Sequence, residues 1–278
     1  MKKILLLFAC TTISFFTLQR SFAQQSLTKL WQTDAVLKVP ESVLFDGAHK
    51  QLYISNIDGA PDGKDGKGSI GKLGLDGKII AIDWVSGLDA PKGMALYNGK
   101  LYVADLSNVV VIDVAKAAII KRIPIDGAAF LNDVTVDSKG IVYISDSETG
   151  KIHRLENDKV TTYLEGFARP NGLLAVGNDL YVLASGAMYK VGADKKQTQI
   201  AEGMEASTDG IEEVKPGEFI VSCWSGVVYY VKNDGSKQEL LDTRTENSNT
   251  ADIGYDAKNR IIYVPTFFKK SVVAYQLK

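Results

Sequence analysis

The chain has 278 residues, of which 45% are hydrophobic, and a formal net charge of −1 at pH 7. Its 32 basic residues nearly balance its 33 acidic ones, so there is no basic surplus for nucleic acid or an anionic membrane surface. Of the two cysteines, Cys10 lies in an N-terminal apolar segment, so we expect packing rather than a disulfide bond to hold the fold.

Residues 1–23 have the pattern of a secretory signal peptide. Lys2 and Lys3 precede an apolar stretch over 4–18, and Ser21-Phe22-Ala23 forms a small-x-small cleavage site. A lipoprotein signal ending at Cys10 is an alternative, but little apolar sequence precedes that cysteine. We therefore expect a single exported domain over 24–278, periplasmic or extracellular, without a membrane span.

Six short polar stretches recur along the rest of the chain, each followed by apolar strand-like runs. Their middle residues are Glu41, Lys92, Asn132, Asn171, Asp209 and Asp252, at steps of 51, 40, 39, 38 and 43 residues. A period near forty, with strands and no helical pattern, predicts an all-β, six-bladed β-propeller with four antiparallel strands per blade. A Gly- and Asp-rich loop over 58–69 accounts for the longer first step.

The last repeat has only three strand-like runs before the chain ends, near Gly254, over 261–264 and over 272–275. The unassigned segment 27–37 contains a plausible strand. We expect this N-terminal strand to complete the last blade, which would close the ring and remove an exposed edge. The second strand of most blades also carries a tyrosine suited to packing between blades. These residues are Tyr53, Tyr102, Tyr143, Tyr181 and Tyr263.

The middle residues of the six stretches should converge at one mouth of the central channel. Five of the six offer side-chain oxygens, the exception being Lys92. Carboxylates gathered in one pocket repel one another unless a cation joins them, and oxygen donors suit calcium. Magnesium, manganese or zinc are alternatives, although zinc prefers His and Cys. Two simpler interpretations stay open, because Asn and Asp are ordinary turn residues and Lys92 could itself neutralise its neighbours.

At these positions the sequence resembles the family of senescence marker protein, gluconolactonase and luciferin-regenerating enzyme. The resemblance implies that Glu41, Asn171 of Asn171-Gly172 and Asp209 of Thr208-Asp209-Gly210 bind a divalent cation. It also implies that Asp209 is the general base of lactone hydrolysis. By the same resemblance, Asn132 of Asn132-Asp133 lies near the metal and the substrate.

The sequence departs from this family at several points. Phe130 replaces an arginine that holds substrate hydroxyls in sugar lactonases, and Ser42-Val43 replaces a Gly-Pro pair. Lys92 and Asp252 have no family role, so we expect Lys92 to contact the substrate with Asn132 and Phe130, and Asp252 to be an additional channel residue. The apolar Phe130 favours a less hydroxylated substrate.

These observations predict an exported, monomeric, calcium-dependent hydrolase of a lactone or related cyclic ester. Its partner would be a small molecule in the central channel. The alternative is a non-catalytic propeller of the NHL-repeat type, which binds a ligand or a protein and uses the ion only for stiffness. The two histidines, His49 and His153, lie outside the six stretches, which argues against histidine-dependent propeller enzymes.

Overall fold

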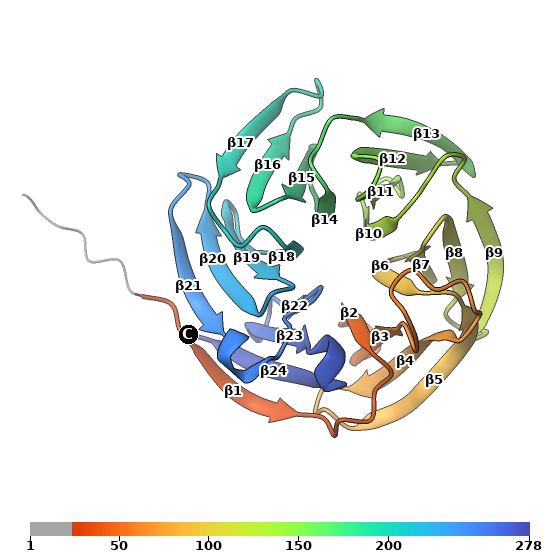
Figure 1. Ribbon diagram of the computed structural model, residues 1–278, viewed down its shortest axis with the longest axis horizontal. Helices are drawn as coiled ribbons and strands as arrows, with labels where there is room; N and C mark the ends of the chain where they lie inside the picture. The colour runs from red at the N-terminus through yellow and green to blue at the C-terminus, as the bar shows by residue number, and fades with distance from the viewer. Residues whose placement is uncertain (1–23) are drawn as a thin grey trace, which may run out of the picture.

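The computed structural model describes residues 24–278, so the predicted signal peptide lies outside the described residues. Six four-stranded antiparallel sheets form a ring around a central channel, which confirms the predicted propeller (Figure 1). Between residues 24 and 278, no helix is long and apolar enough to cross a membrane.

Each blade runs from an inner strand at the channel to an outer strand at the rim. Blade one contains β2 (Pro40–Asp46), β3 (Gln51–Asn56), β4 (Gly68–Gly74) and β5 (Ile79–Leu88). Blade two contains β6 (Pro91–Tyr97), β7 (Lys100–Asp105), β8 (Asn108–Asp113) and β9 (Ala118–Pro124). Blade three contains β10 (Leu131–Val136), β11 (Val142–Asp146), β12 (Lys151–Glu156) and β13 (Lys159–Leu164).

The second half of the ring repeats this order. Blade four contains β14 (Pro170–Val176), β15 (Asp179–Ala184), β16 (Ala187–Val191) and β17 (Gln197–Ala201). Blade five contains β18 (Thr208–Lys215), β19 (Glu218–Cys223), β20 (Val227–Lys232) and β21 (Lys237–Asp242). Blade six contains β22 (Gly254–Asp256), β23 (Ile261–Pro265), β24 (Val272–Leu277) and β1 (Leu27–Gln32). Two 3-10 turns, η1 (Arg244–Glu246) and η2 (Phe267–Lys269), lie in connections.

The N-terminal strand closes the ring. β1 pairs antiparallel with β24, beginning at Leu27 opposite Leu277, and forms the outer strand of blade six (Figure 1). Trp31 fixes this strand against its neighbours. Its Nε1 donates to the Leu75 carbonyl of blade one at 3.0 Å, and its ring centroid lies 5.8 Å from that of Tyr263. The predicted closure by the N-terminal strand is therefore confirmed.

The second-strand tyrosines pack between blades, as predicted. Tyr181 of blade four lies 4.6 Å from Phe219 of blade five, measured between ring centroids. Tyr263 of blade six stacks on Phe45 of blade one at 6.1 Å. Edge and offset contacts of this kind stabilise a seam beyond the area that it buries.

Glycines after two of the ring residues let neighbouring inner strands approach closely. A Cβ on Gly172 would lie 2.1 Å from the Asp209 carbonyl oxygen, and one on Gly93 would lie 2.0 Å from Asp133 Oδ1. Any side chain at these positions would force the blades apart. Lys92 and Asn171, which precede the two glycines, are therefore held close to the channel axis.

Candidate functional site

A cavity of about 290 Å³ lies at one mouth of the channel. The structure brings together six of the seven residues singled out from the sequence. The six that line this cavity are Glu41, Lys92, Phe130, Asn132, Asn171 and Asp209. The seventh, Asp252, lines an adjacent cavity with Ser42, Asp133 and Glu212.

The inner strands are irregular where they carry these residues. In five blades, the pairing between the first and second strands shifts register across the ring residue. The residues concerned are Glu41, Lys92, Asn132, Asn171 and Asp209. Such a bulge takes a residue out of the ladder and re-aims its side chain. The repeated irregularity explains why these five side chains point into one cavity.

Glu41 is buried at 5% exposure, and its Oε2 has no hydrogen-bond partner among residues 24–278. Burial raises the pKa of this carboxyl well above its usual range, and the nearby Asp209 raises it further. The positive charge of Lys92 opposes the rise. A buried carboxyl without a partner is costly, so this position calls for a proton or a cation.

Asp209 is also buried, and it is joined to Asn171. The Asn171 Nδ2 donates to Asp209 Oδ1 at 2.9 Å. Burial raises the pKa of Asp209 well above its usual range, and the charge of Asp252 adds to this. Because Asn171 uses its amide nitrogen on Asp209, its amide oxygen is left as an acceptor for another group.

Asn132 is oriented through blade three. Its Nδ2 donates to Ser147 Oγ at 3.1 Å, and that hydroxyl donates to the Pro170 carbonyl at 2.7 Å. This chain of hydrogen bonds fixes the amide beside Asn171, the next residue after Pro170. Asn132 and Asn171 thus both have their nitrogens occupied, and their oxygens accept no hydrogen bond from the described residues.

Lys92 does not neutralise the carboxylates by direct contact. Its ammonium donates to the carbonyls of Pro61 at 2.7 Å and Ala90 at 3.2 Å, and lies 4.7 Å from the centroid of the Phe130 ring. It forms no ion pair with any carboxylate of the described chain. Burial lowers the pKa of Lys92, while the negative charges of Glu41 and nearby aspartates oppose this.

The bond to Pro61 gives the loop over 57–67 a structural role. This loop joins β3 to β4 in blade one, and Lys92 ties it to blade two. Two exposed hydrogen bonds also hold this loop against the chain beyond β5. Lys64 Nζ donates to Ser107 Oγ at 3.3 Å, and Gly66 N donates to Asp89 Oδ1 at 3.2 Å. The loop therefore spans the seam beside the cavity, and Pro61 forms part of the cavity wall.

Replacing Lys92 with methionine should loosen this loop. The variant keeps an unbranched side chain of similar size but loses both hydrogen bonds of the ammonium. We therefore expect faster amide exchange over 57–67 and calcium affinity within about tenfold of wild type. Exchange mass spectrometry and calorimetry measure the two effects, with Lys116→Met, in the exposed turn between β8 and β9, as the control. Unchanged loop protection together with a new or much tighter calcium site would show that Lys92 replaces the ion.

Asp252 acts on the cavity through its charge. Its Oδ2 accepts from Ser42 Oγ at 2.5 Å, and its backbone pairs in parallel with Ser42. Burial raises the pKa of Asp252 to about 7, although the bond from Ser42 opposes the rise. This carboxyl raises the pKa of Asp209 and Glu41 without lining their cavity.

Sequence reasoning missed the apolar wall above these polar groups. Trp224 and Phe267 line the cavity with Phe130, and Ile57 and Pro61 lie in the same wall. Trp224 follows β19 and Phe267 belongs to η2. Both lie in the connection between the second and third strands of their blade, and the length of this connection differs from blade to blade. The only sequence signal was the pair Phe267-Phe268 in a segment where a polar loop would be expected.

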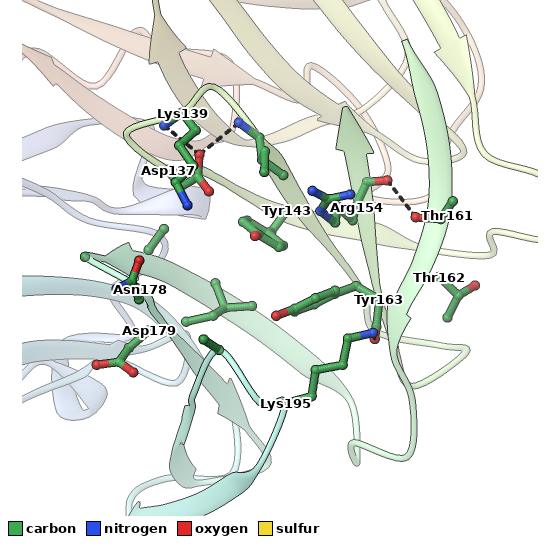
Figure 2. Close-up of a pocket in the computed structure, with 15 residues that line it drawn as sticks. Asp137, Lys139, Tyr143, Arg154, Thr161, Thr162, Tyr163, Asn178, Asp179 and Lys195 are labelled. Carbon is green, nitrogen blue, oxygen red and sulfur yellow. Dashed lines mark hydrogen bonds between the residues drawn. The ribbon is translucent and has the colours of Figure 1, made fainter. Parts of the chain in front are cut away.

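A further cavity, of about 380 Å³, lies between blades three and four (Figure 2). Four of its five charged side chains have partners, among them Asp179, which pairs with Lys190 at 2.8 Å. Arg154 pairs with Glu156 at 2.9 Å, Lys195 donates to the Tyr163 carbonyl at 3.2 Å, and Asp137 accepts backbone bonds in its own turn. None of the unpartnered buried side-chain atoms found in 24–278 lines this cavity. It is therefore a weaker candidate than the channel cavity.

The channel cavity offers donors suited to a hard cation. Within residues 24–278, no group of three or more His, Cys, Asp and Glu side chains is arranged to hold a metal ion. The predicted set contains only two such groups, Glu41 and Asp209, and its third member is the amide of Asn171. The unpartnered Glu41 oxygen and the free amide oxygen fit an oxygen-seeking ion that completes its shell with water.

No protein-family model and no curated protein sequence matches the chain. Solved structures do. A protein of unknown function from Bacteroides thetaiotaomicron superposes with a TM-score of 0.69 at 15% identity, over 92% of this chain and 76% of that one. A streptogramin B lyase superposes with a TM-score of 0.66 at 14% identity, over 91% of this chain and 98% of that one. A catalytically inactive virginiamycin B lyase from Staphylococcus aureus with quinupristin superposes with a TM-score of 0.63 at 13% identity, over 92% of this chain and 100% of that one. These similarities show a shared six-bladed propeller fold.

Proposed function

We propose that the channel cavity binds a divalent cation, calcium first, through Glu41, Asn171 and Asp209, and hydrolyses a lactone or related cyclic ester. The observation that carries this proposal is the buried Glu41 carboxyl, whose Oε2 has no partner although it lies in one cavity with Asp209 and Asn171. Buried polar atoms without a partner are uncommon, and a bound ion is one of the groups that satisfies them.

The electrostatics favour the same conclusion. Glu41 and Asp209 both have raised pKa values because they are buried near other acids. A bound divalent cation would offset this repulsion and keep both groups ionised. Calcium tolerates irregular oxygen sets, whereas magnesium and manganese remain alternatives with stricter geometry. Zinc fits less well, because neither His nor Cys lines the cavity.

In this proposal, the residues that line the cavity have different roles in hydrolysis. Asp209 takes a proton from a water whose oxygen bonds to the lactone carbonyl carbon. The ring C–O bond breaks, and the proton passes to the departing ring oxygen, which leaves a hydroxy acid. Asn132 and Lys92 lie in the same cavity and would position the substrate. A divalent ion in such a site supplies polarisation of the carbonyl and a more acidic water.

A histidine-dependent reaction fits this cavity poorly. His49 lies in a turn, with its Nδ1 2.7 Å from Asp46 Oδ2, and His153 is buried in β12, with its Nε2 3.7 Å from Asp146 Oδ2. Neither histidine lines the channel cavity. The virginiamycin B lyase is catalytically inactive with a histidine-to-alanine substitution, whereas no histidine lines the channel cavity of this chain.

Calorimetric titration of calcium into chelator-treated protein tests the metal site. We expect wild type to bind one ion and Asp209→Ala to lose about 100-fold in affinity, because it lacks one carboxylate ligand. Asp34→Ala, which alters an exposed aspartate between β1 and β2, is the control and should bind like wild type. Absence of binding in all three proteins would reject the metal site and favour the non-catalytic binding propeller.

A further inference from the structure

Large apolar side chains are exposed in two different ways on residues 24–278. Four of them, Leu30, Val36, Ile80 and Ile120, are isolated on outer strands or their connections. The other two, Trp224 at 38% and Phe268 at 58% exposure, lie together, with ring centroids 6.1 Å apart. Grouped exposed aromatics at a cavity mark a binding surface more strongly than scattered ones do.

Phe267 links these two rings to the cavity. Its ring lies edge-on to Trp224 at 5.5 Å and to Phe268 at 4.7 Å, at interplanar angles of 83° and 87°. Phe267 and Trp224 both line the channel cavity. We call Trp224, Phe267 and Phe268 the aromatic platform. It begins inside the cavity and continues onto the exposed surface at its mouth.

The backbone holds the platform in a costly conformation. Phe267 has φ of 48°, in the left-handed region that bulky residues avoid, and Lys270 at the end of η2 has φ of 57°. Thr266 accepts from the Ser271 backbone and donates to the Ser271 carbonyl at 2.8 Å, which closes this tight turn. Local strain that the surroundings maintain is typical of ligand-binding segments.

The lining of the cavity has an apolar part and a polar part. Phe130, Ile57 and Pro61 join the platform in the apolar part, which we call the wall. Glu41, Asn171 and Asp209 belong to the polar part, which we call the floor and which also includes Arg169. A ligand rich in hydroxyl groups would leave several of them unpaired against these walls, which opposes binding. A ligand with one polar end and one flat apolar end would satisfy both surfaces.

We infer that the substrate is a lactone carrying an aryl substituent, with the lactone carbonyl on the carboxylate floor and the aryl ring on the aromatic platform. This inference rests on the proposed hydrolase function and adds the substrate class. Aromatic rings attract one another edge-on or offset, and Trp224 and Phe268 present exposed ring surface for such contacts.

The test separates binding from turnover by using two matched pairs of small molecules. The first pair is γ-phenyl-γ-butyrolactone and γ-butyrolactone, whose hydrolysis is followed by proton release. The second pair is 2-phenyltetrahydrofuran and tetrahydrofuran, which have no carbonyl to hydrolyse and are titrated by calorimetry. The proteins compared are wild type, Trp224→Leu, Phe268→Ala and the control Ile120→Ala, which removes an exposed apolar side chain from β9.

We expect the phenyl group to improve both kcat/KM and affinity by at least about tenfold in wild type and Ile120→Ala. Phe268→Ala should lose about threefold or more of that gain, and Trp224→Leu most of it. Phe268 is more than half exposed, so its variant stays informative even if Trp224→Leu folds poorly.

Two results would overturn the inference. One is equal affinity of wild type for the two cyclic ethers, and the other is a phenyl preference that survives both platform substitutions. Platform-dependent binding of 2-phenyltetrahydrofuran without hydrolysis of either lactone would support the aryl site and reject the hydrolase. Hydrolysis of both lactones without a phenyl preference would support the hydrolase and reject the aryl site.

Discussion

Asp209→Asn should abolish lactone hydrolysis while leaving the propeller folded. The amide cannot accept the proton of the attacking water, and loss of general-base catalysis alone costs about 100-fold or more in rate. The substitution keeps the shape of the side chain and an oxygen that can accept the 2.9 Å bond from Asn171. It also removes a buried acid whose ionised form is disfavoured at this position, so stability should be unchanged or higher.

Asp252→Asn is the matched control for this prediction. It changes the equivalent residue of the sixth blade. The charge of Asp252 raises the pKa of Asp209, but Asp252 does not line the channel cavity. We expect this variant to retain most of the turnover, whereas Asp209→Asn should retain less than about 1%. Proton release from a panel of lactones, with circular dichroism to verify folding, gives the measurement. Wild-type turnover by Asp209→Asn would show that another group is the base.

The propeller could be predicted from the sequence because its repeat period, near forty residues, recurs in every blade. Each blade repeats the same order of ring residue, apolar strand and tight turn, and the shortage of one strand near Val272 identified β1 as its replacement. The inner strands begin earlier than their apolar runs suggested, however. β2 starts at Pro40 rather than at Val43, because the strand continues through the bulge at Glu41.

The floor of the cavity was predictable for the same reason, and its walls were not. Equivalent positions in a closed repeat lie around one axis, so the spacing of Glu41, Asn171 and Asp209 was sufficient to group their oxygen donors. Asp252, at the sixth equivalent position, lies outside this cavity. The bond between Lys92 and the Pro61 carbonyl depends on the path of one loop. Trp224 lies in the connection between the second and third strands of its blade, whose length differs between blades, so the repeat does not predict an aromatic side chain there.

The stability of chelator-treated protein should fall as the pH rises, and calcium should reverse this effect. Burial raises the pKa of Asp252 from 3.8 to about 7 and that of Glu212 from 4.5 to about 8. Each acid holds its proton more tightly in the folded state than in the unfolded state. Their contribution to stability is therefore present below about pH 4 and is lost as the pH rises to about 8.

The size of this effect can be estimated for Asp252. The rise in its pKa corresponds to roughly 4 kcal/mol lost from the free energy of unfolding between about pH 4 and about pH 8. Urea unfolding at several pH values, in chelator, measures it for wild type and for Asp252→Asn. The difference between the two proteins reports the titration of Asp252 together with its effect on the pKa values of Asp209, Glu41 and Glu212. Parallel pH profiles would show that Asp252 does not titrate in this range.

Calcium binding should also depend on pH. An ion can bind Glu41 and Asp209 only after both have ionised, and their pKa values are raised, so binding must release protons and strengthen as the pH rises. The increase in melting temperature caused by calcium should therefore be larger at about pH 8 than at about pH 5.5. Calorimetry in buffers of different ionisation enthalpy counts the protons released. Calcium binding without proton release, equally strong at both pH values, would mean either that the ion is held elsewhere or that Glu41 and Asp209 are already ionised in the metal-free protein. Loss of this binding in Asp209→Ala would identify the second case.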